Sequence, residues 1–419
     1  MMTTLSEPQT VPTRFANRRV AAVVYSHFPS DPRPRRAAEA LVRNGARVEV
    51  ICLKERDDEP QHEVFNGVDV TRVPLKHRRG GKLAYLARYA GFILLAGMIL
   101  AYRSIRSRFH LVHVHNMPDA LVFSALVPKL LGAKVILDLH DPMPELFMTI
   151  FGFGAKGRAV RLLKMLEKWS LGFADAVVTT NEAFRKLFTG RSCAPEKITT
   201  VMNSPDEEIF SLSEVSKVAR REDSTPFVIM YHGSLVERHG LELAVKALAK
   251  LGDIVPNAEL RIFGNRTPYL EQVLDLARSA GLSDAIHYLG PKDLSQIAMA
   301  IRNCDIGIIP NQKNTFTELN MPTRIFEFLS QGKLVIAPRT MGILDYFTPK
   351  DLLFFELGDA DDLAAKIAYA FRNPDEMVKL VERGQEVYRL HRWSVEQVRF
   401  VDLVDKVLRS SARGITVHA

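Results

Sequence analysis

The feature that most constrains the fold of this chain is a repeated alternation of short apolar runs with longer amphipathic runs. In the first half, apolar runs of strand length are RVAAVVYSHF (19–28), ARVEVICLK (46–54), HLVHVHN (110–116), AKVILDLHD (133–141) and DAVVTTN (175–181). Apolar strands that alternate with helices form a parallel sheet covered by helices on both faces. The first half is therefore predicted to be an α/β domain.

A polar, charged segment interrupts this alternation at residues 205–225, and the pattern then resumes through residues 226–393. We interpret the interruption as a linker between two doubly wound Rossmann-like domains, the first covering residues 18–204. A final amphipathic helix is predicted at residues 394–410, and the polar residues 1–17 are expected to be disordered. Two such domains place ligands in a cleft at the carboxyl ends of their strands.

The chain carries a formal net charge of +8, which favours a polyanionic partner. Basic residues flank an apolar stretch within residues 76–108, and no charged residue lies between Arg88 and Arg103. This stretch is shorter than the roughly 20 residues that span a bilayer, so it fits a helix lying on an anionic membrane surface. The alternative is a buried core helix. A nucleic-acid partner is disfavoured, because the basic residues cluster beside an apolar helix that lacks exposed stacking aromatics.

The stretch NMPTRIFEFLSQGKLVIAP (320–338) predicts a helix that starts at the carboxyl end of a strand. Pro322 suits the first helical turn, and the free N–H groups there favour a phosphate. Thr323 and Arg324 share a face with Glu327. Arg324 can neutralise a diphosphate, while Glu327, one turn deeper, can accept hydrogen bonds from the two ribose hydroxyls. The alternative is a surface ion pair between Arg324 and Glu327.

A second loop of this kind follows the apolar run 227–232. Gly233 allows close approach of the backbone to a ligand, and Arg238 and His239 bring positive charge before Gly240 and a helix. Taken alone this loop is a weak indication of a phosphate site.

Together these stretches resemble family 4 glycosyltransferases with the GT-B fold, over about residues 19–409. The matching segments are VVYSHFPSDPRPRRAAEALVRNGARVEVI, HVHNMPDALVFSALVPKLLGAKVILDLHD, YHGSLVERHGLELAVKAL and MPTRIFEFLSQGKLVIAP. The resemblance implies a nucleotide-sugar site in the second domain, an acceptor site in the first, retention of anomeric configuration, no cofactor and no bound metal. It also implies that the last helix crosses back to the first domain.

The resemblance carries specific roles onto the donor side. Glu327 matches the second glutamate of the family's paired-glutamate motif, the ribose ligand, within the branch that has a P-x-K/R-x-x-E pattern. In the phosphate loop, Ser234 and His239 stand where the family has arginine and lysine, and Arg238 is expected to replace the charge. The family's first glutamate is absent because Leu319 occupies its place, and Glu318 is the nearest substitute.

On the acceptor side, His140 and Asp141 follow a strand directly and are expected to face the cleft. The resemblance implies that His140 lies near the donor sugar and the acceptor; the alternative is that the pair only caps the next element. Glu145 is expected in the same space.

The loop after the first strand is also assigned to the acceptor side. It is expected to bring Ser30, Asp31 and Arg33 to the cleft, with Arg33 binding an anionic acceptor such as a lipid diphosphate. Arg35 and Arg36 are interpreted as solvated residues on the face of the following helix.

Metal-site patterns are incomplete in this sequence. The HVHN run offers His113 and His115 without an evident third ligand, and the three cysteines are scattered, so no metal is expected. A nicotinamide dehydrogenase would need a G-x-G-x-x-G loop after the first strand, which is missing. A sugar-nucleotide epimerase of the same fold and a catalytically impaired, nucleotide-binding membrane scaffold remain alternatives.

The expected protein is a retaining glycosyltransferase at the cytoplasmic face of the cell membrane. It would take a nucleotide-diphosphate sugar and a saccharide or polyprenyl-linked acceptor, in cell-surface polysaccharide or glycolipid biosynthesis.

Overall fold

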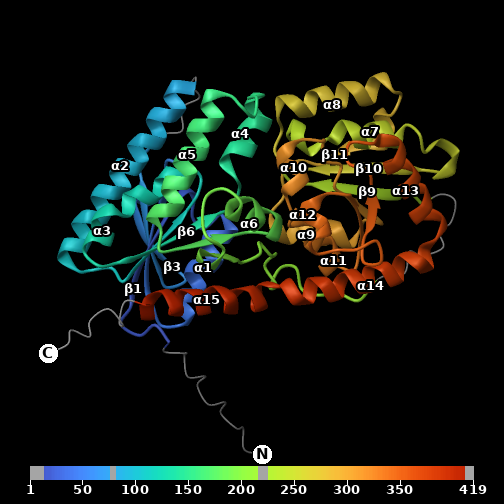
Figure 1. The fold of residues 1–419 in the computed structure, drawn as a ribbon. Helices are drawn as coiled ribbons and strands as arrows, with labels where there is room; N and C mark the ends of the chain where they lie inside the picture. The colour runs from blue at the N-terminus through green and yellow to red at the C-terminus, as the bar shows by residue number, and fades with distance from the viewer. Residues whose placement is uncertain (1–13, 76–81, 216–224, 411–419) are drawn as a thin grey trace, which may run out of the picture.

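The computed structural model describes residues 14–75, 82–215 and 225–410. Within these ranges two sheets form the centres of two domains that lie side by side (Figure 1). The predictions for most of residues 1–17, for residues 76–81 and for part of the linker concern segments outside the described residues. The predicted pair of doubly wound α/β domains is confirmed.

The first sheet has eight strands in the order β3-β4-β2-β1-β5-β6-β7-β8. Its strands are β1 (Arg19–His27), β2 (Arg47–Leu53), β3 (His62–Phe65), β4 (Val68–Val73), β5 (Leu111–His115), β6 (Lys134–Leu139), β7 (Ala176–Thr179) and β8 (Ile198–Thr200). The helices packed on it are α1 (Pro32–Arg43), α2 (Lys82–Arg106), the 3-10 helix η1 (Asp119–Ala125), α3 (Leu126–Leu130), α4 (Met143–Phe151), α5 (Arg158–Phe173) and α6 (Glu182–Thr189). Buried side chains form one apolar layer on each face of the sheet.

One part of this sheet was not identified from the sequence. Strands β3 and β4 form an antiparallel hairpin at the edge of the otherwise parallel sheet. Its turn is Asn66-Gly67, and both residues have positive φ (48° and 78°). Asn-Gly favours this type of two-residue hairpin turn, so the sequence did contain the local signal.

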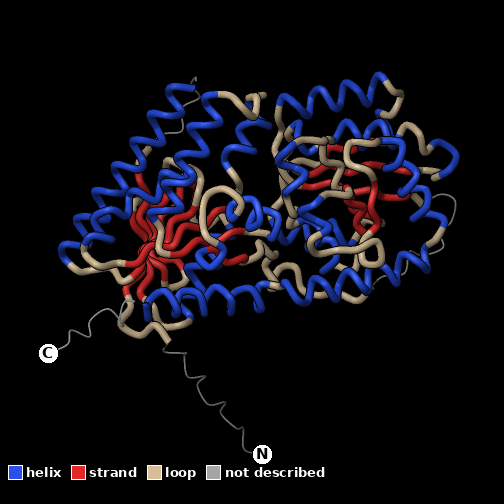
Figure 2. The backbone as a smooth tube through the Cα atoms, in the orientation of Figure 1, coloured by secondary structure: helices blue, strands red, loops and turns tan. Residues whose placement is uncertain are grey.

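The second sheet has six strands in the order β11-β10-β9-β12-β13-β14. Figure 2 shows the strands of both domains with helices around them. Its strands are β9 (Phe227–His232), β10 (Ala258–Phe263), β11 (Ile286–Tyr288), β12 (Ile306–Ile308), β13 (Leu334–Pro338) and β14 (Leu353–Phe355). The helices of this domain are α7 (Leu241–Leu248), α8 (Pro268–Ser279), α9 (Leu294–Arg302), α10 (Thr315–Leu319), α11 (Arg324–Ser330), α12 (Met341–Leu344), α13 (Ala360–Arg372) and α14 (Pro374–His391). The described start of the proposed linker packs here, because Phe210 is buried in this domain's core.

Helix α15 (Trp393–Ser410) crosses back beneath the first domain, as expected (Figure 1). It buries Phe400, Val401 and Val404 in the apolar layer that also contains residues of α1. At its start the fully buried Glu396 accepts a hydrogen bond from the backbone N–H of Met202, at 3.0 Å. The two segments that cross between the domains are thereby tied to each other.

The domains also touch directly across the cleft. Phe316 of α10, in the second domain, is buried in an apolar cluster of the first domain, with its ring centre 6.1 Å from that of Phe184. Nearby, Tyr346 accepts the backbone N–H of Glu182, at 2.8 Å. These contacts hold the carboxyl ends of the two sheets close together.

Helix α2 has two apolar faces. Phe92, Ala96 and Leu100 are fully buried against the first sheet, whereas the opposite face is exposed to solvent. Among the described residues one segment, Ala87–Arg106 of this helix, is long and apolar enough to cross a bilayer by length and composition alone.

Candidate active site

The candidate site lies where the carboxyl ends of β9 and β6 meet across the domain boundary. β9 ends at His232 and leads into the loop 233–240, and β6 ends at Leu139 just before His140 and Asp141. The positive charge of Arg238 in the loop acts on Asp141 and lowers the pKa of that carboxyl, although burial raises it overall to about 6. Donor-side and acceptor-side residues from the two domains are thus brought into one space.

Arg324 provides the positive charge over the donor loop. It is the first residue of α11, and its guanidinium donates to the carbonyl oxygen of His232 at 2.9 Å and stacks 4.7 Å above the ring of Tyr231. Gly233 has φ of +123°, and a Cβ there would meet the arginine side chain at 3.5 Å. Glycine is therefore favoured by the backbone conformation, whereas the arginine side chain lies at an ordinary van der Waals distance that would not by itself exclude a Cβ.

His239 closes the loop and does not supply charge to it. Its Nδ1 lies 2.8 Å from the carbonyl oxygen of Ser234, which also accepts a hydrogen bond from the Tyr231 hydroxyl at 2.9 Å. Burial, with the nearby positive charge of Arg324, lowers the pKa of His239 to about 3. Around this loop the cations are thus Arg238 and Arg324, while Ser234 contributes its backbone.

Glu327 lies one turn deeper in α11 and is not paired with Arg324. Its carboxylate is 3.2 Å from Nε2 of His232, and its side chain is 14% exposed. Burial raises the pKa of Glu327 to about 7 and lowers that of His232 to about 3, so the two do not form an ion pair at neutral pH. The surface ion pair considered as an alternative is absent from the described contacts. The carboxyl of Glu327 is therefore left at the cleft without an arginine or lysine of the described residues in ion-pair contact, although the charges of Arg324 and Arg36 act on it.

The residues that precede Arg324 are fixed by the domain crossover. Pro322 is buried, and the Thr323 hydroxyl donates to the carbonyl oxygen of Asn203 at 3.0 Å. Arg36 of α1 donates to the Asn203 side chain at 2.8 Å and lies over the ring of Trp393. The expectation that Arg36 is solvated was wrong, because the crossover covers it.

Glu318 occupies a different recess of the second domain. Its carboxylate accepts the backbone N–H of Met341 at 3.2 Å. It lines a cavity of about 580 Å³ formed with Lys313, Arg339, Glu356, Leu357, Gly358, Asp359, Ala360 and Asp361. This carboxylate therefore lies among residues that follow β12, β13 and β14.

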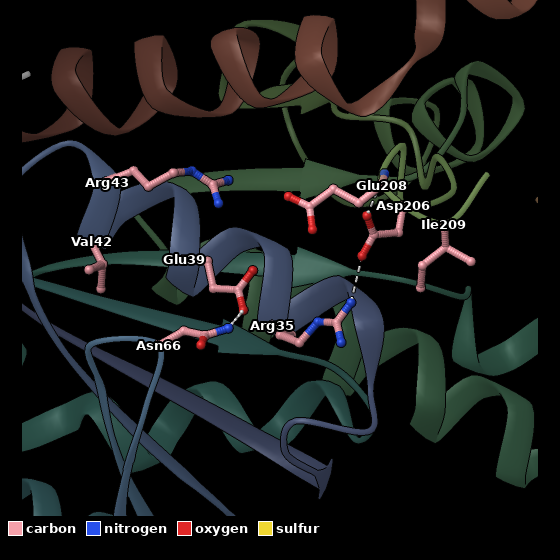
Figure 3. Close-up of a pocket in the computed structure, with 8 residues that line it drawn as sticks. All are labelled: Arg35, Glu39, Val42, Arg43, Asn66, Asp206, Glu208 and Ile209. Atoms are coloured by element: carbon pink, nitrogen blue, oxygen red, sulfur yellow. Dashed lines mark hydrogen bonds and ion pairs between the residues drawn. The ribbon is translucent and has the colours of Figure 1, made fainter. Parts of the chain in front are cut away.

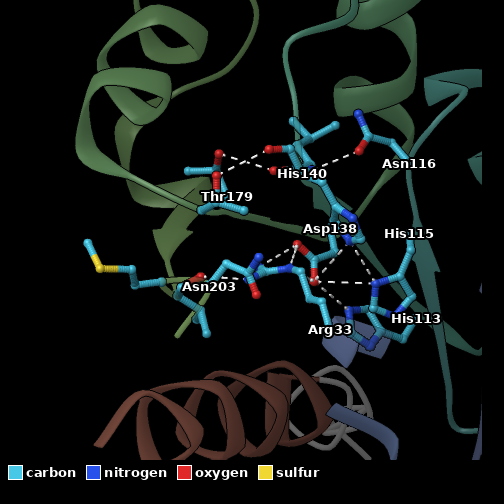
Figure 4. Close-up of polar contacts among 12 residues, drawn as sticks. Arg33, His113, His115, Asn116, Asp138, His140, Thr179 and Asn203 are labelled. Atoms are coloured by element: carbon cyan, nitrogen blue, oxygen red, sulfur yellow. Dashed lines mark hydrogen bonds and ion pairs between the residues drawn. The ribbon is translucent and has the colours of Figure 1, made fainter. Parts of the chain in front are cut away.

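On the acceptor side, His140 is held by the ends of β5 and β6 (Figure 4). Its backbone N–H donates to Oδ1 of Asn116 at 2.7 Å, and its Nε2 lies 3.1 Å from Nδ1 of His115. The side chain is 21% exposed, and burial lowers its pKa. His140 is therefore a neutral, firmly positioned imidazole at the cleft.

Arg33 does not face the cleft as a free cation. Its Nη2 and Nε bind both oxygens of Asp138 at 2.7–3.1 Å, and its Nη1 donates to the carbonyl oxygen of Val201 at 3.0 Å. Because all its nitrogens are engaged and the side chain is 7% exposed, the expected contact with an anionic acceptor was wrong. The sequence did not reveal Asp138 as the partner of Arg33, because Asp138 lies far away in the chain and was assigned only to a strand.

Asp138 also provides a third candidate metal ligand beside His113 and His115. The ligand atoms of these three buried residues lie within 4.8 Å of one another. Asp138 is the neighbour of His115 across the β5–β6 register, which is the signal that could have identified it. Both of its oxygens already bind a guanidinium, so the carboxylate is charge-balanced, and we assign no metal to the cluster.

Three further acceptor-side residues lie in local networks. Glu145 is buried and held by Arg191 at 2.5 and 2.8 Å, so its predicted position in the cleft was wrong. Asp31 caps α1 and accepts the Ser26 hydroxyl at 2.7 Å. Ser30 is exposed and donates to Glu55 at 2.5 Å.

A separate cavity of about 350 Å³ lies between α1 and the crossover segment (Figure 3). Two pairs of its polar side chains bind each other: Arg35 binds Asp206 at 2.7 Å, and Asn66 donates to Glu39 at 2.9 Å. The remaining lining residues are Val42, Arg43, Glu208 and Ile209.

Comparison with known families matches both domains. Residues 31–204 match the family described as "Glycosyl transferase 4-like domain", and residues 213–387 match "Glycosyl transferases group 1". A D-inositol 3-phosphate glycosyltransferase of Corynebacterium glutamicum is 24% identical over 270 residues, which cover 61% of this chain and 63% of that protein. An N,N'-diacetylbacillosaminyl-diphospho-undecaprenol alpha-1,3-N-acetylgalactosaminyltransferase of Campylobacter jejuni is 25% identical over 30% of this chain and 32% of its own length. The chain thus spans less than two thirds of the length of these curated relatives.

Solved structures share the fold at low sequence identity. Sucrose-phosphate synthase from Thermosynechococcus elongatus superposes with a TM-score of 0.74 at 18% identity, covering 94% of this chain and all of that one. Anabaena HepE, solved in complex with UDP-glucose, superposes with a TM-score of 0.68 at 12% identity, covering 93% and 99%. With two matched family segments, two facing Rossmann-like domains and a helix that crosses back, the chain belongs to the glycosyltransferases of the family 4 type with the GT-B fold.

Proposed function

We propose that the protein is a retaining transferase that moves a sugar from a nucleotide-diphosphate sugar to a saccharide or lipid-linked acceptor, in cell-surface polysaccharide or glycolipid biosynthesis. The observation that carries the proposal is the placement of Arg324 and Arg238 around the Gly233 loop. Both cations lie where a diphosphate would meet the end of β9. Glu327 lies one turn deeper in the same helix and would meet the ribose.

The roles follow from how charge moves in the reaction. Glycosyl transfer passes through an oxocarbenium-like state as the diphosphate leaves, so cations on the phosphates lower the barrier. Arg238 and Arg324 would take that role. Glu327 would accept the ribose hydroxyls, and His140 with Asp141 would contact the sugar and the incoming hydroxyl from the other domain. Contact between the domains would exclude water from the reactants.

The similar proteins favour these substrate classes. HepE was solved with UDP and with UDP-glucose, and the Campylobacter jejuni enzyme is named for a diphospho-undecaprenol acceptor. A UDP-sugar and a polyprenyl-linked saccharide are therefore the first donor and acceptor that we would test.

We further propose that the first domain rests on the cytoplasmic face of an anionic membrane. The outer face of α2 exposes Leu94, Met98, Tyr102 and Ile105, whose exposed fractions are 56–75%. On the same side of the sheet, α3 exposes Leu130 and α5 exposes Trp169 (Figure 1).

Basic residues lie beside these apolar side chains. They are the exposed Arg106, Arg108, Arg161 and Lys168. A basic rim around an apolar surface fits an anionic lipid interface. Because the inner face of α2 packs in the domain core, our proposal has the helix lie on the membrane surface and not cross it.

The test is a thermal-shift screen of UDP, GDP, ADP and their sugar conjugates. A ligand at 100 times its Kd stabilises the folded state by about 2.7 kcal/mol. We expect one nucleotide to raise the melting temperature of the wild type and of Glu386→Ala, an exposed control on α14, but not of Glu327→Ala. A larger shift with one sugar conjugate would identify the donor. No shift with any nucleotide would overturn the proposed function.

A further inference from the structure

His140 is the end of a chain of buried side chains that runs away from the cleft. Its Nε2 lies 3.1 Å from Nδ1 of His115, and that same nitrogen lies 3.5 Å from Oδ2 of Asp138. Asp138 is in turn held by Arg33 from α1 and lies 3.5 Å from Nε2 of His113. The chain therefore connects the cleft to a charge-balanced Arg33–Asp138 pair in the core (Figure 4).

The imidazoles of His115 and His140 are neutral. Burial holds the pKa of His115 well below its usual range, and His113, His140 and Arg33 add to that effect. Burial also lowers the pKa of His140, against the opposing charges of Asp138 and Asp31. Each ring therefore carries one proton, and the question is which nitrogen holds it.

The surroundings of His115 decide the position of its proton. A proton on Nδ1 faces the acceptor nitrogen of His140 and the carboxylate of Asp138. Its Nε2 is buried and has no hydrogen-bond partner among the described residues. A proton there would be a buried donor without an acceptor, which is costly. The proton of His115 therefore belongs on Nδ1, and Nε2 of His140 accepts it.

We infer that His115, oriented by Asp138, holds His140 in the Nδ1–H tautomer, so that His140 presents a hydrogen-bond donor and not a base to the cleft. His115 and Asp138 are positioning residues, because they act through His140. Hydrogen bonds from the His140 backbone N–H to Asn116 and from the Thr180 hydroxyl to the His140 carbonyl oxygen fix the backbone independently. The ring of His140 can therefore move only by rotation about its side-chain torsions.

This inference rests on the proposed function and deepens it, because it sets what His140 recognises. A neutral N–H donor binds the oxygen of a sugar hydroxyl, whether on the donor or on the acceptor. It cannot remove the proton of the attacking hydroxyl. In a retaining transfer with a diphosphate leaving group, deprotonation would then fall to a group other than His140.

The tautomer can be measured on the free protein by nitrogen-15 NMR of the imidazole rings, in buffer with EDTA. The resonances that are missing from the spectrum of His140→Gln are those of the His140 ring. In the wild type at pH 7.5 we expect Nδ1 of His140 to be protonated and Nε2 to be bare. His115→Leu removes the donor, and we expect His140 to shift towards the Nε2–H form. His115→Asn is nearly isosteric with leucine and retains an N–H near the place of Nδ1, so it should restore the wild-type tautomer.

The outcomes separate this inference from the proposed function, because no substrate is present. An Nε2–H tautomer in the wild type, or identical His140 spectra in all three proteins, would overturn it. Stoichiometric zinc in the protein purified without EDTA would overturn it too, since the same nitrogens would then be ligands. If a donor sugar is found, His115→Leu should lower kcat by about 10-fold or more with little change in KM, and His115→Asn should recover most of the loss.

Discussion

At the scale of single residues, the proposed donor site takes its positive charge from two separate elements. The loop after β9 has Ser234 and a neutral His239, and its charge comes from Arg324 of a later helix and from Arg238. The surroundings of Glu327 disfavour its charged form, since burial raises its pKa to about 7. A buried carboxyl without an ion-pair partner destabilises the fold, and such groups are common at functional sites.

Glu327→Gln should therefore affect stability and binding in opposite directions. The folded protein raises this pKa from 4.5 to about 7, so the proton is bound more tightly in the folded state than in the unfolded state. The resulting stability is present below pH 4.5 and is lost as the pH rises through 7. We expect the variant to melt at a higher temperature than the wild type at pH 8, with the difference vanishing towards pH 4, by calorimetry.

Nucleotide affinity provides the second half of this test. A carboxylate accepts both ribose hydroxyls, but the protonated acid and the amide do so less well. The affinity of the wild type for its nucleotide should rise between pH 6 and 8 by more than that of Glu327→Gln, which follows only the remaining groups. Since Asp141 has a pKa of about 6, Asp141→Asn serves as the control for its contribution. Parallel pH curves for the wild type and Glu327→Gln would contradict the ribose role.

At the scale of secondary-structure elements, the short helix α10 connects the two halves. Asn314 caps it and also meets the Thr149 hydroxyl of α4 at 3.2 Å. Phe316, on its first turn, is 4% exposed and belongs to the apolar cluster of the other domain. Phe316 is thus the buried side chain through which α10 packs on the first domain, and the partly buried Leu319 packs against the same cluster.

Phe316→Ala should open the contact between the domains. Truncating a buried phenylalanine costs about 3 kcal/mol or more, and here the loss falls on the domain boundary. We expect the variant to melt at a lower temperature and to have a larger radius of gyration in small-angle scattering. Phe188→Ala, in the same cluster but within the first domain, should lower the melting temperature without enlarging the particle. An unchanged radius for Phe316→Ala would show that other contacts suffice.

At the scale of the whole molecule, the exposed apolar side chains are unevenly distributed. Those on α2, α3 and α5 share one side of the first sheet, and the described part of α2 ends among exposed arginines. Arg106 lies 4.3 Å above the ring of Tyr102 on that surface. We propose that this side of the first domain is the one that faces the membrane.

Vesicle flotation tests this orientation. Leu94→Ser, Met98→Ser and Ile105→Ser combined should weaken binding to anionic vesicles, since each buried apolar side chain contributes about 1.5 kcal/mol, or about tenfold. Exposed apolar residues of the second domain provide the matched control, Met299→Ser with Leu390→Ser, which should bind as the wild type does. Binding should also fall as salt screens the basic rim. Equal binding by both variants, or by neutral vesicles, would contradict the membrane proposal.

The sequence by itself determined the elements and their order. Apolar runs of strand length alternating with amphipathic stretches allow little besides parallel sheets, and this identified the two domains, whereas the return of the last helix to the first domain was expected only from the family resemblance. It also placed Gly233, Arg324 and Glu327 at the carboxyl ends of strands, because that position follows from local order along the chain.

Only the tertiary structure decided which charged side chains remain free to meet a substrate. Arg33 and Glu145 belong to loops and helix starts near the cleft, yet Arg33 is bound to Asp138, 105 positions away, and Glu145 to Arg191, 46 positions away. Local pattern cannot give such partners, because they depend on how distant strands and helices pack. Burial then sets the charge of what remains, since a desolvated side chain is stable only when it is paired or neutral.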